Sequence, residues 1–505
     1  MFSVASIGNS CFERCLKLVQ IEMNPYKTTV QRNSFARCPL LKSLVFLSSI
    51  ESTEQFNFEQ IGCQIEEITI PSSVKTIDKY SFYGNDSLRK VNIMSSVNCI
   101  KSHAFENCYL LREITIPSSV NSIDSCAFKK CISLETLEIF SSVVTIGSNC
   151  FEECSKLSQI KIHSSVKNIG QNAFDKCLSL KSIEIPSSVN SIKKCTFLKC
   201  IMLKEVKIPP TVTKIGSSSF EECQSLTKIS LPPIKSIKQN TFKNCIFLSQ
   251  VIIPSSVKSI KSNAFEKCLM LSSVVIPSSV KYIHSEAFMD CIGFERITIP
   301  SSVKSIESGA FEGCSKLISI EILCNLESIK AATFRYCSKL KQIVIPESVI
   351  TIEQSAFEGC FSLESIELNS NLQSIDKASF KNCSSLSQIA IPSSVILIGP
   401  GAFEDCIKLK TVDYSDDSYL TMIESSAFKN CQVLAYMRIP SSVTLIGESA
   451  FDGCSQLSDL LIPSSVKSVG HGAFNGCTSL TNLTIPSSID LGNLGICSQV
   501  KVTHE

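Results

Sequence analysis

The chain has 505 residues, of which 44% are hydrophobic and 19% are charged. This composition supplies ample material for a buried core and argues against a disordered chain. The 48 Lys and Arg residues nearly balance the 46 Asp and Glu residues, and the resulting net charge of +2 argues against a nucleic-acid-binding protein.

A phenylalanine recurs along almost the whole chain at a nearly constant spacing of about 23 residues. It occurs at 21 positions, and 17 of the 20 intervals have the same length, whereas the other three differ by only one or two positions. A fixed period of this length is typical of a solenoid, in which each unit buries the open faces of its neighbours. We therefore predict one solenoid of about 21 repeats over residues 1–490. The marker phenylalanines are at positions 12, 35, 58, 82, 105, 128, 151, 174, 197, 220, 242, 265, 288, 311, 334, 357, 380, 403, 428, 451 and 474.

Each unit contains a strand and a turn, and in thirteen units a proline ends the strand, as residues 248–265 illustrate. Within this unit, residues 249–254 read SQVIIP, in which side chains alternate as in a strand with β-branched residues at the buried positions. Pro254 ends the strand because it has no amide hydrogen. Ala264 and Phe265 then lie in a segment that we expect to form a short helical or 3₁₀ turn. Stacked units predict an α/β solenoid, a curved rod with one long parallel sheet on its concave side and these turns on its convex side.

The pattern L-x-x-I-x-I-P-S-S-V-x-x-I-x-x-x-A-F-x-x-C resembles the leucine-rich repeats of BspA-like surface proteins of bacteria and of parasitic protists such as trichomonads. The resemblance extends from Val4 to Ile489 and implies a leucine-rich-repeat solenoid. It departs from the commonest leucine-rich repeat at the ninth residue, which is Asn or Cys there and usually Ser here, as at Ser73, Ser256 and Ser465. We expect these serine hydroxyls to satisfy the backbone amides of the turn in place of an asparagine ladder.

Three stretches depart from the regular unit. Residues 47–64 match the repeat pattern poorly over one repeat. Residues 491–505 form a degenerate C-terminal end, in which Cys497 lies where a marker phenylalanine is expected. Residues 411–424 belong to a unit with two extra residues, and this insertion is either a contact loop or a bulged crossover with a solvated acidic tip. The insertion concentrates acidic and aromatic residues at Asp413, Tyr414, Asp416, Asp417 and Tyr419.

Nineteen of the 27 cysteines lie three residues after a marker phenylalanine, as Cys108 and Cys268 do. A cysteine at a fixed depth in every unit is typical of a small buried apolar residue. A series of disulfides is the alternative if the chain is exported. The spacings of the remaining cysteines do not match a zinc motif, so we predict no metal site.

No motif indicates catalysis. The chain contains neither a phosphate-binding G-x-x-x-x-G-K loop nor a G-x-S-x-G nucleophile motif. The motif S-x-x-K occurs at Ser255 and Lys258 and again in many other units, whereas an active site is a single place. We therefore predict a non-enzymatic protein without a cofactor.

Residues beside the buried strand positions should point outward on the concave side. They are mixed in charge and vary between units, whereas the buried positions hardly vary. This pattern fits an extended protein-binding surface, and it also fits neutral variation at positions where any soluble residue is allowed. The candidate binding residues are Lys90, Glu113, Glu205, Lys207, Gln250, Arg296, Glu367, Tyr436, Arg438 and Asp459.

The resemblance implies a cell-surface recognition protein, such as an adhesin or surface antigen, with host or extracellular-matrix proteins as ligands. The alternative is a cytoplasmic scaffold for protein–protein interaction, which the absence of a signal peptide and the expected free thiols favour. The chain contains no uninterrupted run of about 18 apolar residues, so the sequence predicts no membrane-spanning helix. Val4, Ile7 and Phe12 already match the repeat pattern, so the first repeat has no cap in this sequence. We therefore expect either end-to-end self-association through this repeat or a longer parent protein.

Overall fold

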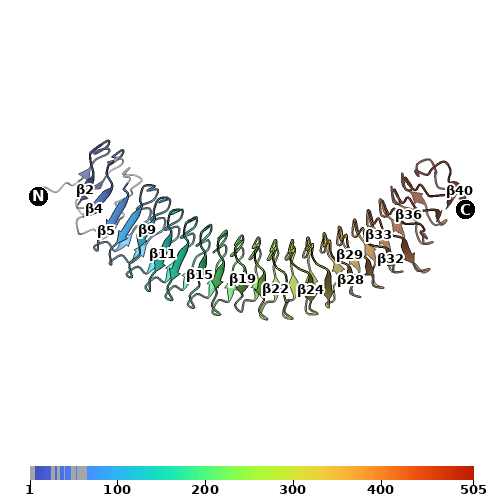
Figure 1. Cartoon of the computed structure of the whole chain (residues 1–505), viewed down its shortest axis with the longest axis horizontal. Helices are drawn as coiled ribbons and strands as arrows, with labels where there is room; N and C mark the ends of the chain where they lie inside the picture. The colour runs from blue at the N-terminus through green and yellow to red at the C-terminus, as the bar shows by residue number, and fades with distance from the viewer. Residues whose placement is uncertain are drawn as a thin grey trace. The chain divides into compact units, whose positions relative to one another are not determined.

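The computed structural model of the chain describes residues 6–23, 29–30, 34–38, 40–46, 53 and 65–504. The chain divides into two compact units, Met1–Pro254 and Ser255–Glu505. Apart from Thr53, the irregular stretch predicted at residues 47–64 lies outside the described residues. Each unit is a stack of coils in which a longer strand is followed by a two-residue strand, and Figure 1 shows the strands of each unit side by side along that unit. The single curved rod stays a prediction.

The first unit contains β1 to β21. Its long strands are β2 (Gln20–Met23), β4 (Ser43–Phe46), β5 (Glu67–Ile70), β7 (Lys90–Ile93), β9 (Glu113–Thr115), β11 (Thr136–Ile139), β13 (Gln159–Ile162), β15 (Ser182–Glu184), β17 (Glu205–Lys207), β19 (Lys228–Ser230) and β21 (Gln250–Ile252). Its short strands are β1 (Ser6–Ile7), β3 (Thr29–Val30), β6 (Thr76–Ile77), β8 (Cys99–Ile100), β10 (Ser122–Ile123), β12 (Thr145–Ile146), β14 (Asn168–Ile169), β16 (Ser191–Ile192), β18 (Lys214–Ile215) and β20 (Ser236–Ile237).

The second unit contains β22 to β40. Its long strands are β24 (Arg296–Ile299), β26 (Ser319–Ile322), β28 (Gln342–Val344), β30 (Ser365–Glu367), β32 (Gln388–Ile391), β34 (Thr411–Tyr414), β37 (Asp459–Leu461), β39 (Asn482–Ile485) and β40 (Lys501–His504). Its short strands are β22 (Ser259–Ile260), β23 (Tyr282–Ile283), β25 (Ser305–Ile306), β27 (Ser328–Ile329), β29 (Thr351–Ile352), β31 (Ser374–Ile375), β33 (Leu397–Ile398), β35 (Met422–Ile423), β36 (Leu445–Ile446) and β38 (Ser468–Val469).

The strands pair in parallel and in register with the repeat. Leu137 pairs with Ile160, and Ile123 with Ile146, so each residue pairs with its counterpart one repeat further along the chain. The parallel solenoid is therefore confirmed, but the strands form several sheets in two series rather than one long sheet. The long strands β24, β26, β28 and β30 form one sheet, and the short strands from β27 to β38 form another of seven strands. β40, inside the stretch predicted to be degenerate, pairs in parallel with β39.

The marker phenylalanines form the centre of the core in both units. Phe105 is fully buried, and its ring stacks on Phe82 and Phe128 with centroids 4.9 and 5.3 Å apart. The same near-parallel stacking continues from Phe82 to Phe242 in the first unit and from Phe265 to Phe474 in the second. Each ring is thus covered by its neighbours above and below, which is how a repeat without its own closed core becomes buried.

The ladder cysteines are buried free thiols from Cys38 onward. Each also forms a hydrogen bond, as when Cys131 Sγ donates to the carbonyl oxygen of Phe105 in the preceding coil at 3.2 Å. Burial raises the pKa of the Cys131 thiol well above its ordinary value, so the group stays a neutral donor. The cysteine therefore links successive coils, a role that its apolar character alone did not indicate.

The turns around the phenylalanines are not helical, so the prediction of helical or 3₁₀ turns was wrong for the described residues. His103 and Asn107, on either side of Phe105, have φ values of 62° and 64°, which interrupt a right-handed helix. The amide of Phe105 donates to Ala127 O in the next coil at 2.8 Å, whereas the amide of Cys108 donates to Phe105 O within its own coil at 3.2 Å. Bonds between coils alternate with bonds inside a coil, which a helix does not allow.

The serines of the P-S-S-V segment also bond differently from the prediction. Ser465 Oγ donates to the carbonyl oxygen of Val443 at 2.8 Å, and Ser119 Oγ donates to Val97 O at 2.6 Å. These hydroxyls act as donors to carbonyl groups of the preceding coil rather than as acceptors for amides. The serine row therefore connects neighbouring coils at the start of the short strands.

Candidate functional site

The exposed side of the long strands, here called the strand face, contains eight of the ten candidate binding residues. Tyr436 and Arg438 continue this face in a coil whose corresponding segment forms no named strand. In β21, Gln250 and Ile252 are exposed while Val251 between them is 8% exposed and faces the core. The same alternation occurs in β9 around Glu113 and in β17 at Glu205 and Lys207. A strand with one buried side places every second side chain on its other side. The strand face is therefore built from the positions that vary between repeats.

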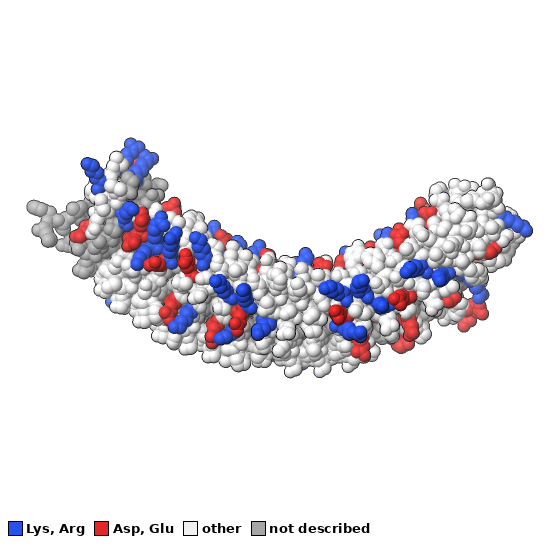
Figure 2. All heavy atoms as spheres, viewed as in Figure 1, with Lys and Arg blue, Asp and Glu red and all other residues white. Residues whose placement is uncertain are grey.

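Opposite charges on neighbouring strands pair with one another along this face. In the first unit, Lys90 Nζ lies 3.2 Å from a carboxylate oxygen of Glu113, and Lys161 Nζ lies 2.6 Å from Glu138. Figure 2 shows acidic and basic atoms next to each other at several places on the face that it draws. Exposed pairs of this kind contribute little stability. They also leave these residues less available to a partner than unpaired charges would be.

A groove of about 370 Å³ lies on the strand face of the second unit. Its lining includes Tyr436, Arg438, Asp459 and Leu461. Tyr436 is 63% exposed and Leu461 is 50% exposed, although both are large and partly apolar. Tyr436 is placed there by an isolated parallel bridge to Asp459, so three of the ten candidate residues come together at this groove.

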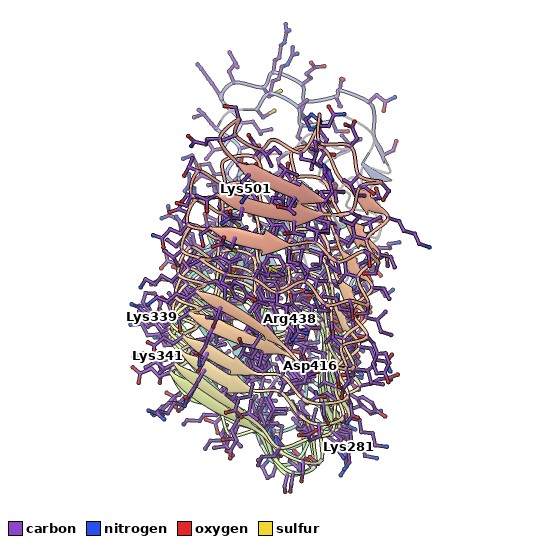
Figure 3. All side chains as sticks on the ribbon, turned by 90° about the vertical axis from the view of Figure 1, so that its right-hand side faces the viewer. Lys281, Lys339, Lys341, Asp416, Arg438 and Lys501 are labelled. Carbon is purple, nitrogen blue, oxygen red and sulfur yellow. The ribbon has the colours of Figure 1, made fainter. Side chains whose placement is uncertain are left out.

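The insertion joins the same site through one ion pair. Arg438 Nη1 lies 2.5 Å from Asp416 Oδ1, and Figure 3 shows these two labelled side chains close together. Asp417 and Tyr419 are also exposed. Tyr414 differs: its hydroxyl is buried without a hydrogen-bond partner among the described residues, and burial raises its pKa. Tyr414 pairs with Ile391 at the end of β34 and is only partly exposed, so it belongs to the strand rather than to a contact loop.

The remaining candidates are spread along the two units and do not meet at one place. Sequence reasoning also missed several exposed apolar residues on the strand face. Val275 is 81% exposed and Val344 is 68% exposed, at the same position in the coil as Ile252. The sequence did carry a signal for them, namely an apolar residue at a position where other coils have Thr, Lys or Glu. A second groove that was not predicted, of about 620 Å³, includes Thr136 and Gln159 of the first unit.

Among the described residues, no group of three His, Cys, Asp or Glu side chains is arranged to hold a metal ion. The described part of the chain also has no helix with the length and hydropathy needed to cross a membrane. What the strand face offers is a broad row of exposed side chains over a rigid sheet. Such an arrangement fits recognition of a large molecule better than conversion of a small one.

The sequence matches the family described as BspA type leucine rich repeat region (6 copies) over residues 5–135, 121–248, 235–338, 314–419 and 416–495. The chain belongs to the BspA-type leucine-rich-repeat family. Leucine-rich-repeat families are generally non-enzymatic, and membership of this family is consistent with a protein-binding repeat protein. No curated protein matches this BspA-type chain.

Three solved structures similar to this BspA-type chain come from bacteria. A leucine-rich repeat protein from Bacteroides ovatus is 21% identical, with 92% of this chain and 87% of that chain covered and a TM-score of 0.35. A leucine rich cell surface protein from Faecalibacterium prausnitzii is 28% identical, with 73% and 83% covered and a TM-score of 0.34. A leucine-rich repeat protein from T. pallidum is 32% identical, with 33% and 79% covered and a TM-score of 0.32.

Proposed function

We propose that this BspA-type chain is a non-enzymatic recognition protein of the cell surface that binds host or extracellular-matrix proteins through its strand face. The supporting observation is the alternation within each long strand. Buried positions such as Val251 and Ile297 hardly vary between coils, whereas their exposed neighbours change in charge, size and polarity. A rigid row of varied side chains is how solenoids bind extended partners.

The groove at Tyr436 is the centre of the proposed contact. Tyrosine and arginine are the residue types that contribute most to protein interfaces, and both are exposed here beside Leu461. Asp416 pairs with the Arg438 guanidinium at the edge of the groove, in an exposed ion pair that a ligand group can approach from solvent. The acidic residues Asp416 and Asp417 of the insertion would then lie beside the ligand as a polar rim.

A cytoplasmic scaffold with the same binding face is the second candidate, and the free cysteines favour it. The described residues contain 26 cysteines, all as free thiols. Thiols persist most readily in a reducing compartment. A membrane-impermeant labelling reagent applied to intact cells, combined with a thiol count on the folded protein, separates the two candidates. Labelling of intact cells supports the surface protein, and labelling only after lysis supports the scaffold.

The binding face itself is tested by photo-crosslinking from two matched tyrosine positions. A photoreactive phenylalanine analogue replaces Tyr436 on the strand face or, as the control, Tyr282 on short strand β23, which is 43% exposed. Each full-length variant is exposed to purified extracellular-matrix proteins and to serum proteins. We expect covalent adducts from position 436 and few from position 282, because only the first position faces the ligand.

Two further variants show whether the adduct depends on the groove. Arg438→Ala in the position-436 crosslinking protein should reduce the adduct, whereas Lys304→Ala, which alters an exposed residue outside the strand face, should not. Equal adduct yields from positions 436 and 282 would show that contact with these proteins is nonspecific. Adducts mainly from position 282 would place the binding face on the other strand series.

A further inference from the structure

A groove on the short-strand side of the first unit contains an unusual concentration of lysines. Its volume is about 640 Å³, and it lies at β16, β18 and β20. The five lysines that line it are Lys193, Lys194, Lys214, Lys235 and Lys238, and all five are exposed. The lining contains no Asp or Glu. Because successive coils stack about 4.8 Å apart, these ammonium groups form a short array of closely spaced positive charges.

Two features of the sequence open the groove at this place. Gly216 lies between the coils of Lys193 and Lys238, and a Cβ atom at Gly216 would come within 2.5 Å of the Lys193 carbonyl carbon. The position therefore has no side chain between the two lysine rows. The coil from Phe220 to Phe242 is also one residue shorter than the usual coil, and β18 is not paired with β20. The missing side chain and the missing pairing together leave a hollow.

The lysines of the groove are not neutralised by their surroundings. None of the five ammonium groups forms an ion pair or hydrogen bond with another described residue, in contrast to Lys199, which lies 3.6 Å from Glu222. Residues 186–240 contain nine lysines and three glutamates, with no arginine or aspartate, so this segment has a charge of +6 whereas the whole chain has +2. Concentrated unpaired charge of one sign attracts ligands of the opposite sign.

We propose that this groove binds a sulfated polysaccharide. Lysine is a compact point charge with three rotatable donors, each of which can bond to a sulfate oxygen. A polysaccharide chain lying across the coils of β16, β18 and β20 would present several sulfates to the lysine array at once. The hydroxyl of Thr213, in the lining, can bond to a sugar hydroxyl between the sulfates.

Other polyanions fit the groove less well. The lining has no aromatic side chain on which a nucleic-acid base could stack. Ile192 and Ile215 are 3% and 2% exposed, so they cannot insert into a membrane whose surface carries anionic lipids. An acidic peptide is bound most effectively by arginine forks and by pockets for apolar anchors, and neither is present here. A sulfated sugar, which needs only charges and hydroxyl contacts, matches what the groove offers.

The test measures binding of dextran sulfate to the full-length protein by calorimetry, with uncharged dextran of the same length as the control polymer. In the groove variant, Lys193, Lys194, Lys214 and Lys238 are replaced by Gln. In the matched control variant, the exposed lysines Lys156, Lys181, Lys204 and Lys228 of the same unit are replaced by Gln. Both variants lose the same net charge. We expect the groove variant to bind dextran sulfate at least about tenfold more weakly and the control variant to change by less than about threefold.

The salt dependence gives a second measure. Binding by the parent protein should weaken steeply as sodium chloride rises, and the groove variant should show a shallower dependence because fewer ions are released on binding. Equal losses in the two variants, or no binding of dextran sulfate by the parent protein, would overturn the proposal. So would tighter binding of a single-stranded RNA, of vesicles with anionic lipids or of polyglutamate than of dextran sulfate. Because this groove lies outside the strand face, its failure leaves the proposed protein-binding function untouched, and the reverse also holds.

Discussion

The two sides of each coil differ in how strictly their structure is repeated. The turn side, from the residues before each marker phenylalanine to the cysteine after it, stacks without a gap from Phe82 to Phe242 and from Phe265 to Phe474. On the strand side, by contrast, pairing is interrupted at several places, for example between β14 and β16. Each of the three larger grooves lies on the strand side. The stacking of the turn side is therefore repeated more strictly than the pairing of the strands.

Changes of coil length that fall within the described residues occur on the strand side as well. The coil from Phe220 to Phe242 lacks one residue beside Pro233, and its short strand β20 is not paired with β18. The coil from Phe403 to Phe428 has its two extra residues between β34 and β35, and β35 remains paired with β33. A shorter segment cannot reach the position of the short strand, whereas a longer one can bulge into solvent. Length is not the only cause, because β14 and β16 are unpaired in coils of the usual length.

The largest effect should come from shortening a marker phenylalanine in the two coils of altered length. Phe220 stacks on its neighbours at 5.5 and 5.6 Å, and Phe403 on its neighbours at 5.3 Å on both sides. Both rings are fully buried. We expect Phe220→Ala and Phe403→Ala each to lower the free energy of unfolding by about 3–5 kcal/mol, because each leaves a cavity. Urea denaturation followed by circular dichroism measures both.

If the two variants lose very different amounts of unfolding free energy, the turn side is not repeated as strictly as we argue. A much smaller loss for Phe220→Ala would mean that the missing residue on the strand side has already loosened the turn side of that coil. Lys408→Ala, an exposed residue in the coil of Phe403, is the control and should change the unfolding free energy by less than about 0.5 kcal/mol.

A smaller effect is expected when the length of a regular coil is changed on its strand side. Ser142 Oγ donates to Val120 O at 2.5 Å, just before β12, which is paired with both β10 and β14. Deleting Ser142 should cost about 2 kcal/mol, the equivalent of two or three lost hydrogen bonds. Inserting two residues after Ser141 should cost only about 0.6 kcal/mol. Hydrogen exchange of the Ile123 and Ile146 amides should speed up in the deletion variant alone; similar exchange in both variants would refute the argument from chain reach.

The third prediction concerns the turn side, which is not altered by the deletion or the insertion beside Ser142. It is a dependence of stability on pH. Oδ1 of Asp175 is buried without a hydrogen-bond partner among the described residues. Burial, with a further contribution from the charge of Glu152, raises the pKa of Asp175 to about 6. Below about pH 3, the carboxyl is largely protonated in both the folded and the unfolded chain and costs nothing. Between about pH 4 and pH 6, the unfolded chain ionises while the folded chain resists ionisation, so stability falls over this range and stays lower at higher pH.

Asp175→Asn removes this penalty. We expect the variant to exceed the parent by about 1–2 kcal/mol in unfolding free energy at pH 7.5 and to match it near about pH 3. Glu153→Gln is the control of opposite sign, since the hydrogen bond from Lys176 at 2.9 Å lowers the pKa of Glu153. That variant should lose stability at pH 7.5 and recover relative to the parent in acid. The same direction of change in both variants would show that the burial of Asp175 is not the cause.

The repeat period and the buried positions were predictable from the sequence because each depends on contacts that recur in every coil. Phe265 and Val251 are buried as predicted, since a position that is apolar in every unit leaves few alternatives. The turns were not predictable in the same way. Whether a turn is helical depends on which carbonyl accepts each amide, and the bond from Phe105 to Ala127 joins residues of different coils. A pattern read within one unit contains no information about that bond.

For the candidate site, the sequence predicted only which side chains are exposed, because the alternation along each strand determines this property. The exposure of Tyr436, Arg438 and Asp459 was predictable, because alternate side chains of an extended segment point to opposite sides. Their meeting at one groove follows from the pairing of Tyr436 with Asp459 in the next coil. Only the contact of Arg438 with Asp416 depends on how the inserted segment folds back. The lysine groove was missed because its residues come from three coils. A count of charge along the sequence, +6 within residues 186–240, was the available signal.

The smallest effect concerns the ion pair between the insertion and the strand face, and it decides between the two interpretations of the insertion. The side chains of Arg438 and Asp416 are 58% and 82% exposed, so their attraction is screened by water and salt. A double-mutant cycle with Asp416→Asn and Arg438→Gln should give a coupling energy in unfolding of less than about 0.5 kcal/mol. In the crosslinking experiment, however, Arg438→Gln should reduce adducts from position 436 strongly. That combination identifies a contact loop that contributes to binding without holding the coil together. A coupling energy above about 1.5 kcal/mol with unchanged adducts would instead make the insertion a structural crossover, with its acidic tip outside the binding site.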